Sequence, residues 1–246
     1  MKTSAAFFSN PAAVVKAVRR AAANLVPPPE LPPSVWAEGS KERGILPGVK
    51  IPVGNAIPGP INFDNAPHQR GMIDVIKEPG IRRVDYMMAA QTGKTTVQQC
   101  ITGYFIAYEP RSQIMAQPSQ GDMQTFLETK LKPMLEANPS ISSKMAKARG
   151  REGVSNSRIM SYLGGWLMFS WSGSPKTARG RSAPVTQADE VDGMHATKEG
   201  DFVELLAQRS ATFGDQRLDT RSSTPTVMGE SRIHVGFLEG DQRRYY

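Results

Sequence analysis

The clearest hydrophobic pattern in the chain is a helical stripe that follows a short strand and a turn. Residues 82–89, RRVDYMMA, have the composition of a strand. After the turn, apolar side chains return every three or four positions, as on one face of a helix: Val97, Cys100, Ile101, Tyr104, Phe105 and Tyr108. The pattern predicts a strand, a loop and a helix, with Cys100 as a small buried core residue.

Strands and helices alternate through the rest of the chain. We expect a short helix over residues 71–79 and a longer one from about residue 120 to 138. The expected strands span residues 113–117, 184–192 and 217–226, and two more form a hairpin over 157–173 around Gly164 and Gly165. This order predicts an α/β fold with a central, mostly parallel sheet flanked by helices.

The amino-terminal part differs in composition. An amphipathic helix is expected from about Pro11 to Ala23, and the charges that follow Asn10-Pro11 argue against a signal peptide. PPPELPP, residues 27–33, is a stiff spacer, and residues 44–60 are rich in glycine and proline. We therefore expect residues 1–58 to form an arm and residues 59–246 to form one domain.

Composition narrows the class of protein. The chain has 246 residues, of which 39% are hydrophobic and 22% charged, which is enough for a packed core. The net charge of +7 suits a polyanionic partner such as nucleic acid. The single cysteine excludes an internal disulfide and a cysteine-rich metal site, and it fits a reducing cytoplasm. We expect no membrane span.

The turn between the first strand and the helical stripe carries AAQTGKTT, residues 89–96. A phosphate-binding loop aims consecutive backbone N–H groups at an anion, its lysine reaches the β and γ phosphates, and the next hydroxyl binds Mg²⁺. Lys94 and Thr95 suit these two roles. The full pattern requires glycine at position 88, where Met88 stands, so an ordinary strand-to-helix turn with an exposed lysine is the alternative.

Two later segments add to the nucleotide hypothesis. Asp189-Glu190 follows a predicted strand, where an acid can hold Mg²⁺ and the next glutamate can polarise water; residues 185–188 are polar for a buried strand, and a solvated acidic turn is the alternative. Ser223 and Thr224, in RSSTP, stand at the end of a further strand and could sense a γ phosphate. Taken alone, Ser-Thr-Pro is a common turn, and the segment matters only as the third element in this order.

The order of these segments and their amino-acid sequences resemble the large terminase subunit of lambda-like tailed phages, the motor that packages viral DNA. The resemblance runs from about Pro32 to the end. Its carrying segments are LPPSVWAE, AAQTGKT, SQIMAQPSQGDMQTFLETKLKPML, GGWLMFSWSGSP, ADEVD, SSTP and SRIHVGFLEGDQRRYY. Loops of the form AAQ-x-GKT are normal in that family, so the missing glycine marks a variant loop.

The resemblance implies roles for residues of a P-loop ATPase. ATP would lie against the loop and Gln69 would read adenine; Thr95 and Asp189 would hold Mg²⁺; Glu190 would be the catalytic base; Ser223 and Thr224 would couple hydrolysis to movement. The loop residues are Ala90, Gln91, Thr92, Gly93, Lys94, Thr95 and Thr96. Some terminases carry an arginine where Ala90 stands, so Arg179 or Arg181 could act as an arginine finger from a neighbouring subunit, or form a simple basic loop.

The implied function is an ATPase motor that moves double-stranded DNA into a procapsid. Its implied partners are DNA, a small terminase subunit, the portal and further copies of the chain in a ring, in the host cell cytoplasm. We see no paired acid cluster after Glu190, so we expect the nuclease domain of the family, and DNA cleavage, to be absent. A helicase-like translocase and a non-catalytic packaging module, favoured by Met88 and the polar strand, are the alternatives.

Overall fold

The computed structural model describes residues 30–53, 57–145, 158–197 and 200–245, together with Ala12, Val14, Val15 and Val18. Contacts divide the chain into Met1–Leu31 and a larger compact unit, Pro32–Tyr246. The helix predicted over residues 11–23 lies largely outside the described residues. The features below all belong to the larger unit.

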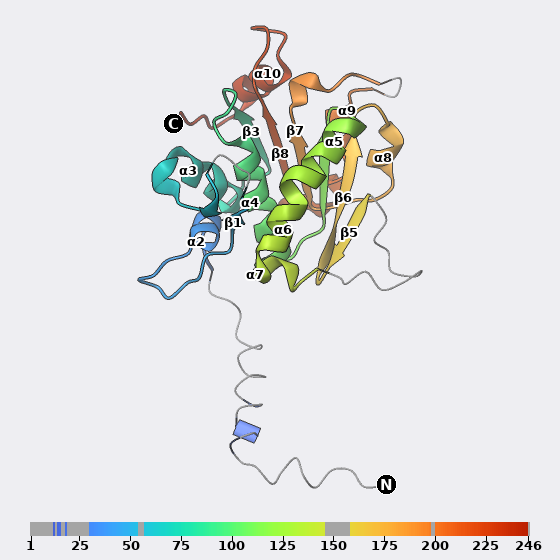
Figure 1. Ribbon diagram of the computed structural model, residues 1–246. Coiled ribbons are helices and arrows are strands. Elements are labelled where there is room, and N and C mark those ends of the chain that lie inside the picture. Colours follow the sequence, from blue (N-terminus) through green and yellow to red (C-terminus); the bar gives the residue numbers. More distant parts are fainter. Residues whose placement is uncertain are drawn as a thin grey trace, which may run out of the picture. The chain divides into compact units, whose positions relative to one another are not determined.

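A six-stranded sheet forms the centre of this unit (Figure 1). Its order is β3-β8-β7-β4-β6-β5, and all neighbouring strands are parallel except the hairpin β5-β6. The strands are β3 (Arg83–Met87), β4 (Gln113–Gln117), β5 (Ile159–Tyr162), β6 (Gly165–Trp171), β7 (Val185–Asp189) and β8 (Leu218–Ser223). This confirms the predicted α/β class with a mostly parallel central sheet.

Helices pack on both faces of the sheet, because successive strand residues point to opposite sides. Met115 joins the core beneath the first group of helices, and its neighbour Ile114 joins the core on the other face. The first group is α2 (Pro33–Glu38), α3 (His68–Asp74), α4 (Lys94–Ala107), α5 (Gln120–Phe126), α6 (Lys132–Ala137) and α7 (Pro139–Ser142); the second is α8 (Pro175–Arg179), α9 (Phe202–Ala207) and α10 (Arg232–Glu239).

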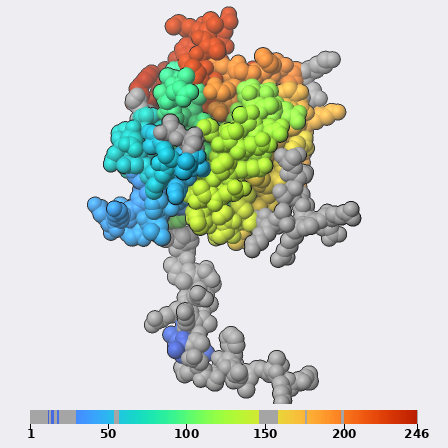
Figure 2. All heavy atoms as spheres, in the orientation of Figure 1, coloured from blue at the N-terminus to red at the C-terminus, as the bar shows by residue number. Residues whose placement is uncertain are grey.

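The long helix predicted over residues 120–138 is present with one interruption. A π-helical turn, η3 (Leu127–Leu131), joins α5 to α6. Pro133 has no N–H to donate to the carbonyl of Thr129, so the regular α-helical ladder cannot run through this point. The atoms of α5 and α6 cover the strands beneath them in the space-filling view (Figure 2).

Short elements complete the unit. A two-stranded antiparallel ribbon pairs β1 (Lys50–Ile51) with β2 (Gly59–Pro60). The 3-10 turns are η1 (Phe63–Asn65), η2 (Val75–Lys77), η4 (Val191–Gly193) and η5 (Ala211–Gln216). No helix among the described residues is long and apolar enough to cross a membrane.

The compact unit begins at Pro32. The composition had suggested a later start, at residue 59. Trp36 on α2 is 6% exposed and stacks edge to face on Tyr104 of α4, with 5.7 Å between ring centroids. The side chain of Asn138 bonds both backbone groups of Lys50, at 2.6 and 3.0 Å. This stretch is therefore part of the compact unit, and two of its apolar residues, Val49 and Ile51, are buried in the core.

Replacing Trp36 by alanine is expected to lower the free energy of unfolding by about 3–5 kcal/mol, because it empties a large buried volume beneath α2. Chemical denaturation of the whole chain measures this change. Leu46→Ala is the matched control, since Leu46 is 85% exposed and its loss should change stability by less than about 0.5 kcal/mol. Equal stability of both variants would show that residues 32–58 form part of an arm and not of the compact unit.

Candidate nucleotide site

The loop between β3 and α4 starts one residue later than the full phosphate-loop pattern requires. Met88 continues the strand, because its N–H bonds the carbonyl of Ser223 at 3.1 Å. Its side chain is 8% exposed and belongs to the core beneath α4. A buried methionine therefore replaces the glycine at position 88, and the turn itself begins at Ala89.

Two side chains of helix α3 contact the backbone of this loop. His68 Nε2 lies 3.2 Å and Gln69 Nε2 lies 3.3 Å from the carbonyl oxygen of Thr92. Within the loop, the Thr92 hydroxyl donates to the carbonyl of Ala89 at 2.7 Å. The amide of Gln69, predicted to read adenine, thus contacts the loop backbone, and its role toward a base stays a prediction. Sequence patterns gave no indication of His68.

Gly93 suits its backbone conformation and lies against the side chain of Gln69. Its φ is 96°, in the left-handed region, and a Cβ there would overlap the amide nitrogen of Gln69. Gln91 also has a positive φ, of 63°, which is uncommon for a residue with a side chain. Ala90 and Gln91 are exposed on the loop, and Thr95 and Thr96 are half-buried in the first turn of α4.

Gly93→Ala is expected to weaken the binding of an ATP analogue by at least about tenfold, because the added Cβ displaces the Gln69 amide from the Thr92 carbonyl and the left-handed backbone at position 93 becomes strained. Titration with a fluorescent analogue measures the affinity. Gly80→Ala is the matched control, with a φ of 83° but nothing within 4 Å of an added Cβ. It should cost about 1–2 kcal/mol of stability and leave the affinity unchanged; a normal affinity in Gly93→Ala would argue against this loop as the phosphate site.

Lys94 is the first residue of α4, and its ammonium group lies among residues from two other strands. Lys94 Nζ is 3.0 Å from Glu190 Oε1 and donates a hydrogen bond to the hydroxyl of Thr224. The lysine is 9% exposed, whereas the Glu190 side chain is 44% exposed. An exposed lysine on an ordinary turn, the alternative left open by the sequence, does not describe this geometry.

The Asp189 carboxylate is buried and held by three donors. Oδ1 accepts from the Ser222 hydroxyl at 2.8 Å and from the Glu190 N–H at 3.1 Å, and Oδ2 accepts from Gln117 Nε2 at 3.1 Å. Burial raises the pKa of this carboxyl and the Glu190 charge adds to the rise, while the bonds from Ser222 and Gln117 oppose it. Gln98 of α4 supports Ser222 through a 2.9 Å bond.

The polar residues of β7 are buried, and they bond to side chains of other elements. Thr186 donates to Asp219 Oδ1 at 2.9 Å, and Gln187 Nε2 donates to Thr102 Oγ1 and Gln113 Oε1, each at 3.0 Å. All residues of β7 are buried. The strand predicted before Asp189 is therefore confirmed as an interior strand, and the alternative of a solvated acidic turn does not describe it.

Glu190 lies beside the end of β8. Its backbone is left-handed, with φ and ψ both 53°, and its Oε2 accepts from the Ser223 hydroxyl at 3.3 Å and the Thr224 N–H at 3.4 Å. Because β8 lies between β3 and β7 in the sheet, its carboxyl end separates the loop from the acids and contacts both. The fold thus brings together Lys94, Asp189, Glu190, Ser223 and Thr224.

The two candidate finger arginines lie elsewhere. The Arg181 guanidinium stacks over Trp166, 5.2 Å from the ring centroid, at the amino-terminal start of β6. Three strands, β8, β7 and β4, separate β6 from β3, so at about 4.8 Å per strand the two are roughly 19 Å apart. Arg179 ends α8 on the same connection. Within one chain, neither arginine belongs to the Lys94 cluster.

The residues present suit a magnesium nucleotide. The loop amides and the start of α4 can receive phosphate oxygens, and Lys94 supplies positive charge. Among the described residues no three or more His, Cys, Asp or Glu side chains gather into a metal site, so Mg²⁺ would use Asp189 and Thr95 together with phosphate and water oxygens, its usual ligands. A cavity of about 470 Å³ opens beside the loop, lined in part by His68, Met72, Ala89 and Thr92.

Residues 55–246 match the model of the family "Phage terminase large subunit gpA, ATPase domain". The chain belongs to this family. The terminase large subunit of Escherichia phage lambda is 26% identical over 181 residues, which are 70% of this chain and 27% of the phage lambda protein. This terminase ATPase domain therefore spans about a quarter of the length of that relative.

Two solved terminase structures share the fold. The HK97 bacteriophage large terminase superposes with a TM-score of 0.62 at 14% identity, covering 85% of this chain and 40% of that chain. The large terminase ATPase domain of Thermus phage P74-26 gives 0.50 at 14% identity, covering 68% of each. The α/β fold with a mostly parallel central sheet is thus shared with these two terminase structures.

Proposed function

We propose that this chain binds ATP with Mg²⁺, hydrolyses it, and uses the energy to move double-stranded DNA into a procapsid. The observation that carries the proposal is the meeting of Lys94 with Glu190 and Thr224, 96 and 130 residues later in the chain, at the carboxyl edge of a parallel sheet. Ligands of open α/β sheets bind at this edge. Membership of the terminase ATPase family supports a nucleotide as this ligand.

Each residue has a distinct role in the proposed reaction. The amides of residues 90–96 and the ammonium of Lys94 hold the phosphates, and Gln69 keeps the loop in shape. Asp189 and Thr95 would hold Mg²⁺, which neutralises charge on the transferred phosphoryl group when bound. Glu190 orients a water molecule and accepts its proton. Its carboxylate is 44% exposed, so it can take this role without the desolvation cost of being buried further.

Ser223 and Thr224 are the proposed coupling residues. Thr224 contacts Lys94 through its hydroxyl and Glu190 through its N–H, and Ser223 contacts Glu190. If a change at the phosphates draws Lys94 away from Glu190, it alters the contacts that Ser223 and Thr224 make with these two residues. The end of β8 would then move with the state of the nucleotide.

The wider assembly follows from the same proposal. Arg181 or Arg179 would reach the phosphates of a neighbouring copy, because neither belongs to the cluster in its own chain. A ring of copies in the host cytoplasm would provide that neighbour, together with a portal and a small terminase subunit. DNA would be held mainly through its phosphates, since a packaging motor must pass any sequence.

Magnesium-dependent hydrolysis separates this proposal from its alternatives. A non-catalytic packaging module would not turn over ATP, and a helicase-like translocase would separate the strands of a duplex. The features that favoured the module have structural explanations: Met88 extends β3, and the polar residues of β7 have partners in the core. An ATPase assay and a strand-separation assay on the same protein decide among the three.

Binding to duplex DNA is expected to be insensitive to sequence and to weaken steeply with salt, because phosphate contacts release counterions. If the chain neutralises six or more phosphates, the affinity should fall by about 10³-fold or more between 50 and 200 mM salt. Fluorescence anisotropy with two unrelated duplexes measures both properties. Binding that distinguishes the duplexes and ignores salt would contradict the motor proposal.

A further inference from the structure

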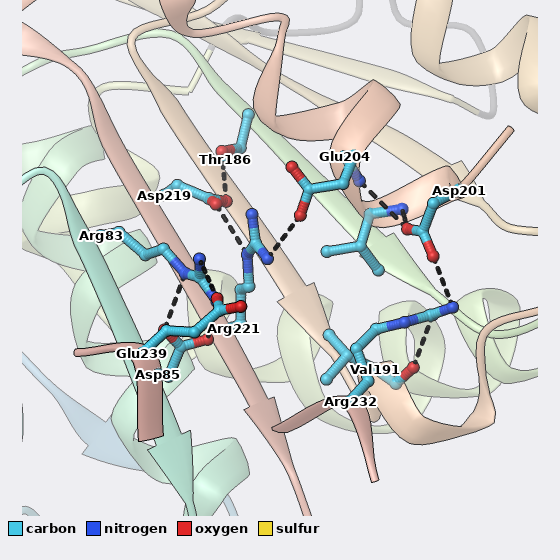
Figure 3. Close-up of polar contacts among 11 residues, drawn as sticks. Arg83, Asp85, Thr186, Val191, Asp201, Glu204, Asp219, Arg221, Arg232 and Glu239 are labelled. Atoms are coloured by element: carbon cyan, nitrogen blue, oxygen red, sulfur yellow. Dashed lines mark hydrogen bonds and ion pairs between the residues drawn. The ribbon is translucent and has the colours of Figure 1, made fainter. Parts of the chain in front are cut away.

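The turn directly behind Glu190 is held by an arginine from the carboxyl-terminal part of the chain. Arg232 Nη1 donates to the carbonyl of Val191 at 3.0 Å, and Nη2 pairs with Asp201 Oδ2 at 2.6 Å (Figure 3). Nη1 also donates to the carbonyl of Met194 at 2.8 Å. Asp201 also caps α9 through the N–H groups of residues 203 and 204. One guanidinium therefore joins the turn η4, the start of α9 and the start of α10.

The same turn is fixed from the other side by Asp192. Its Oδ1 accepts from the N–H of Ile233 at 2.9 Å, and its Oδ2 accepts from the N–H and hydroxyl of Thr226, at 3.1 and 2.9 Å. Burial alone would raise the pKa of Asp192, but hydrogen bonds from Ser231, Ile233 and Thr226 lower it below the ordinary value. Asp192 is thus a carboxylate near neutral pH, tied to both ends of the segment between β8 and α10.

These contacts act on the backbone of a residue in an unusual conformation. Glu190 is one of two non-glycine residues with positive φ among those described, and it precedes η4 directly. A left-handed conformation of this kind costs about 1–3 kcal/mol and persists only where its surroundings enforce it. Arg232 bonds the carbonyl of Val191, which begins the turn, and that of Met194, which follows it. These bonds enforce the left-handed conformation of Glu190.

We propose that Arg232 is a positioning residue for Glu190, acting with Asp192 through the turn Val191–Gly193. This inference rests on the proposed function, in which Glu190 is the catalytic base. Arg232 does not touch the nucleotide side of the cluster; it fixes the direction from which the Glu190 carboxylate meets Lys94 and water. Loss of the clamp should slow the chemical step and leave nucleotide binding intact.

A neighbouring ion-pair network provides the matched control. At the other end of α10, Glu239 Oε2 lies 3.5 Å from Arg83 Nη1, and Arg83 also pairs with Asp85 (Figure 3). Glu239 ties α10 to Arg83 of β3, whereas Arg232 ties α10 to η4 and α9. Glu239→Gln therefore loosens the same helix without releasing the turn, and its turnover should stay at the wild-type level.

The main experiment compares Mg²⁺-ATP hydrolysis by the wild type, Arg232→Gln and Glu239→Gln. We expect kcat of Arg232→Gln to fall by about 10- to 100-fold while KM stays within about threefold, because an error of about 1 Å at a reacting group costs up to about 100-fold. Arg232→Lys keeps the positive charge but has one nitrogen in place of two, so it cannot bond the two carbonyls and pair with Asp201 at the same time; its kcat should lie between those of the wild type and Arg232→Gln. It also serves if Arg232→Gln does not fold.

A double variant shows whether Arg232 acts through Glu190. Single-turnover rates of Glu190→Gln and of Glu190→Gln with Arg232→Gln should agree within about twofold, because the clamp has no base left to position. Hydrogen exchange should also accelerate in residues 190–194 of Arg232→Gln and not of Glu239→Gln.

Several results would overturn the inference. An unchanged kcat in Arg232→Gln, an equal loss in Glu239→Gln, or a further loss in the double variant would each show that Arg232 does not position Glu190. A wild-type chain without turnover, or turnover that Glu190→Gln leaves intact, would instead remove the proposed function, and the positioning role with it. The two failures are thus distinguishable in one set of assays.

Discussion

Lys94→Ala is expected to abolish ATP hydrolysis and to weaken the binding of Mg²⁺-ATP by at least about 100-fold. Lys94 is the cation that meets Glu190 and Thr224 at the carboxyl edge of the sheet, and it begins the helix that would face the phosphates. Hydrogen bonds to charged groups contribute about 1.5–3 kcal/mol each, and a lysine contacting two phosphates makes more than one. Calorimetric titration and a phosphate-release assay measure the two quantities.

The fold should survive this substitution. Glu190 loses its cation but is 44% exposed, so water can solvate the carboxylate. Lys77→Ala is a suitable control, because Lys77 also pairs with a glutamate, Glu109, at 2.5 Å, but outside the cluster. Circular dichroism should give the same spectrum for both variants. Wild-type nucleotide affinity in a folded Lys94→Ala protein would rule out this phosphate site.

Glu190→Gln is expected to bind Mg²⁺-ATP at least as tightly as the wild type and to hydrolyse it about 10²- to 10⁴-fold more slowly. The amide oxygen can still accept from Ser223 and Thr224, but it cannot take a proton from water. Binding should not suffer, because Lys94 no longer has a carboxylate competing with the phosphates. Single-turnover hydrolysis and an equilibrium titration on the same preparation separate the two effects.

Two further variants sharpen this result. Glu136→Gln, on the exposed side of α6, removes the same charge far from the cluster and should hydrolyse ATP normally. Asp189→Asn should raise the Mg²⁺ concentration needed for turnover, since the proposed metal ligand becomes neutral. Hydrolysis at the wild-type rate in both Glu190→Gln and Asp189→Asn would assign these acids to a structural role in the turn.

Local sequence patterns predicted the elements of this fold well and their spatial partners poorly. The strand, loop and helix around Lys94 follow from residues near one another in the chain, and the structure contains them. His68 and Arg232 were not indicated, because their contacts depend on which elements become neighbours. Arg232 meets Val191 only through the packing of α10 beside η4.

The arm predicted over residues 1–58 ends too late, because Trp36 packs on Tyr104 and joins residues before 59 to the compact unit. The strand predicted over residues 184–192 is present, and bonds from Gln187 to Thr102 and Gln113 explain how so polar a strand is buried. Composition describes a segment alone, whereas burial depends on what the rest of the chain places against it. The sheet order β3-β8-β7, which puts Ser223 between the loop and the acids, is likewise absent from any single segment.

The buried polar side chains of β7 also help to fix the pairing register of the strand. A slip of β7 by one residue would turn Gln187 toward the apolar side of the sheet that holds Ala188, and it would move Asp189 away from Ser222 and Gln117. Each buried polar group left without a partner costs about 1–3 kcal/mol. A misaligned molecule would thus lose both stability and the position of Asp189, the proposed metal ligand, so misfolded copies with an intact surface but a defective site would be rare.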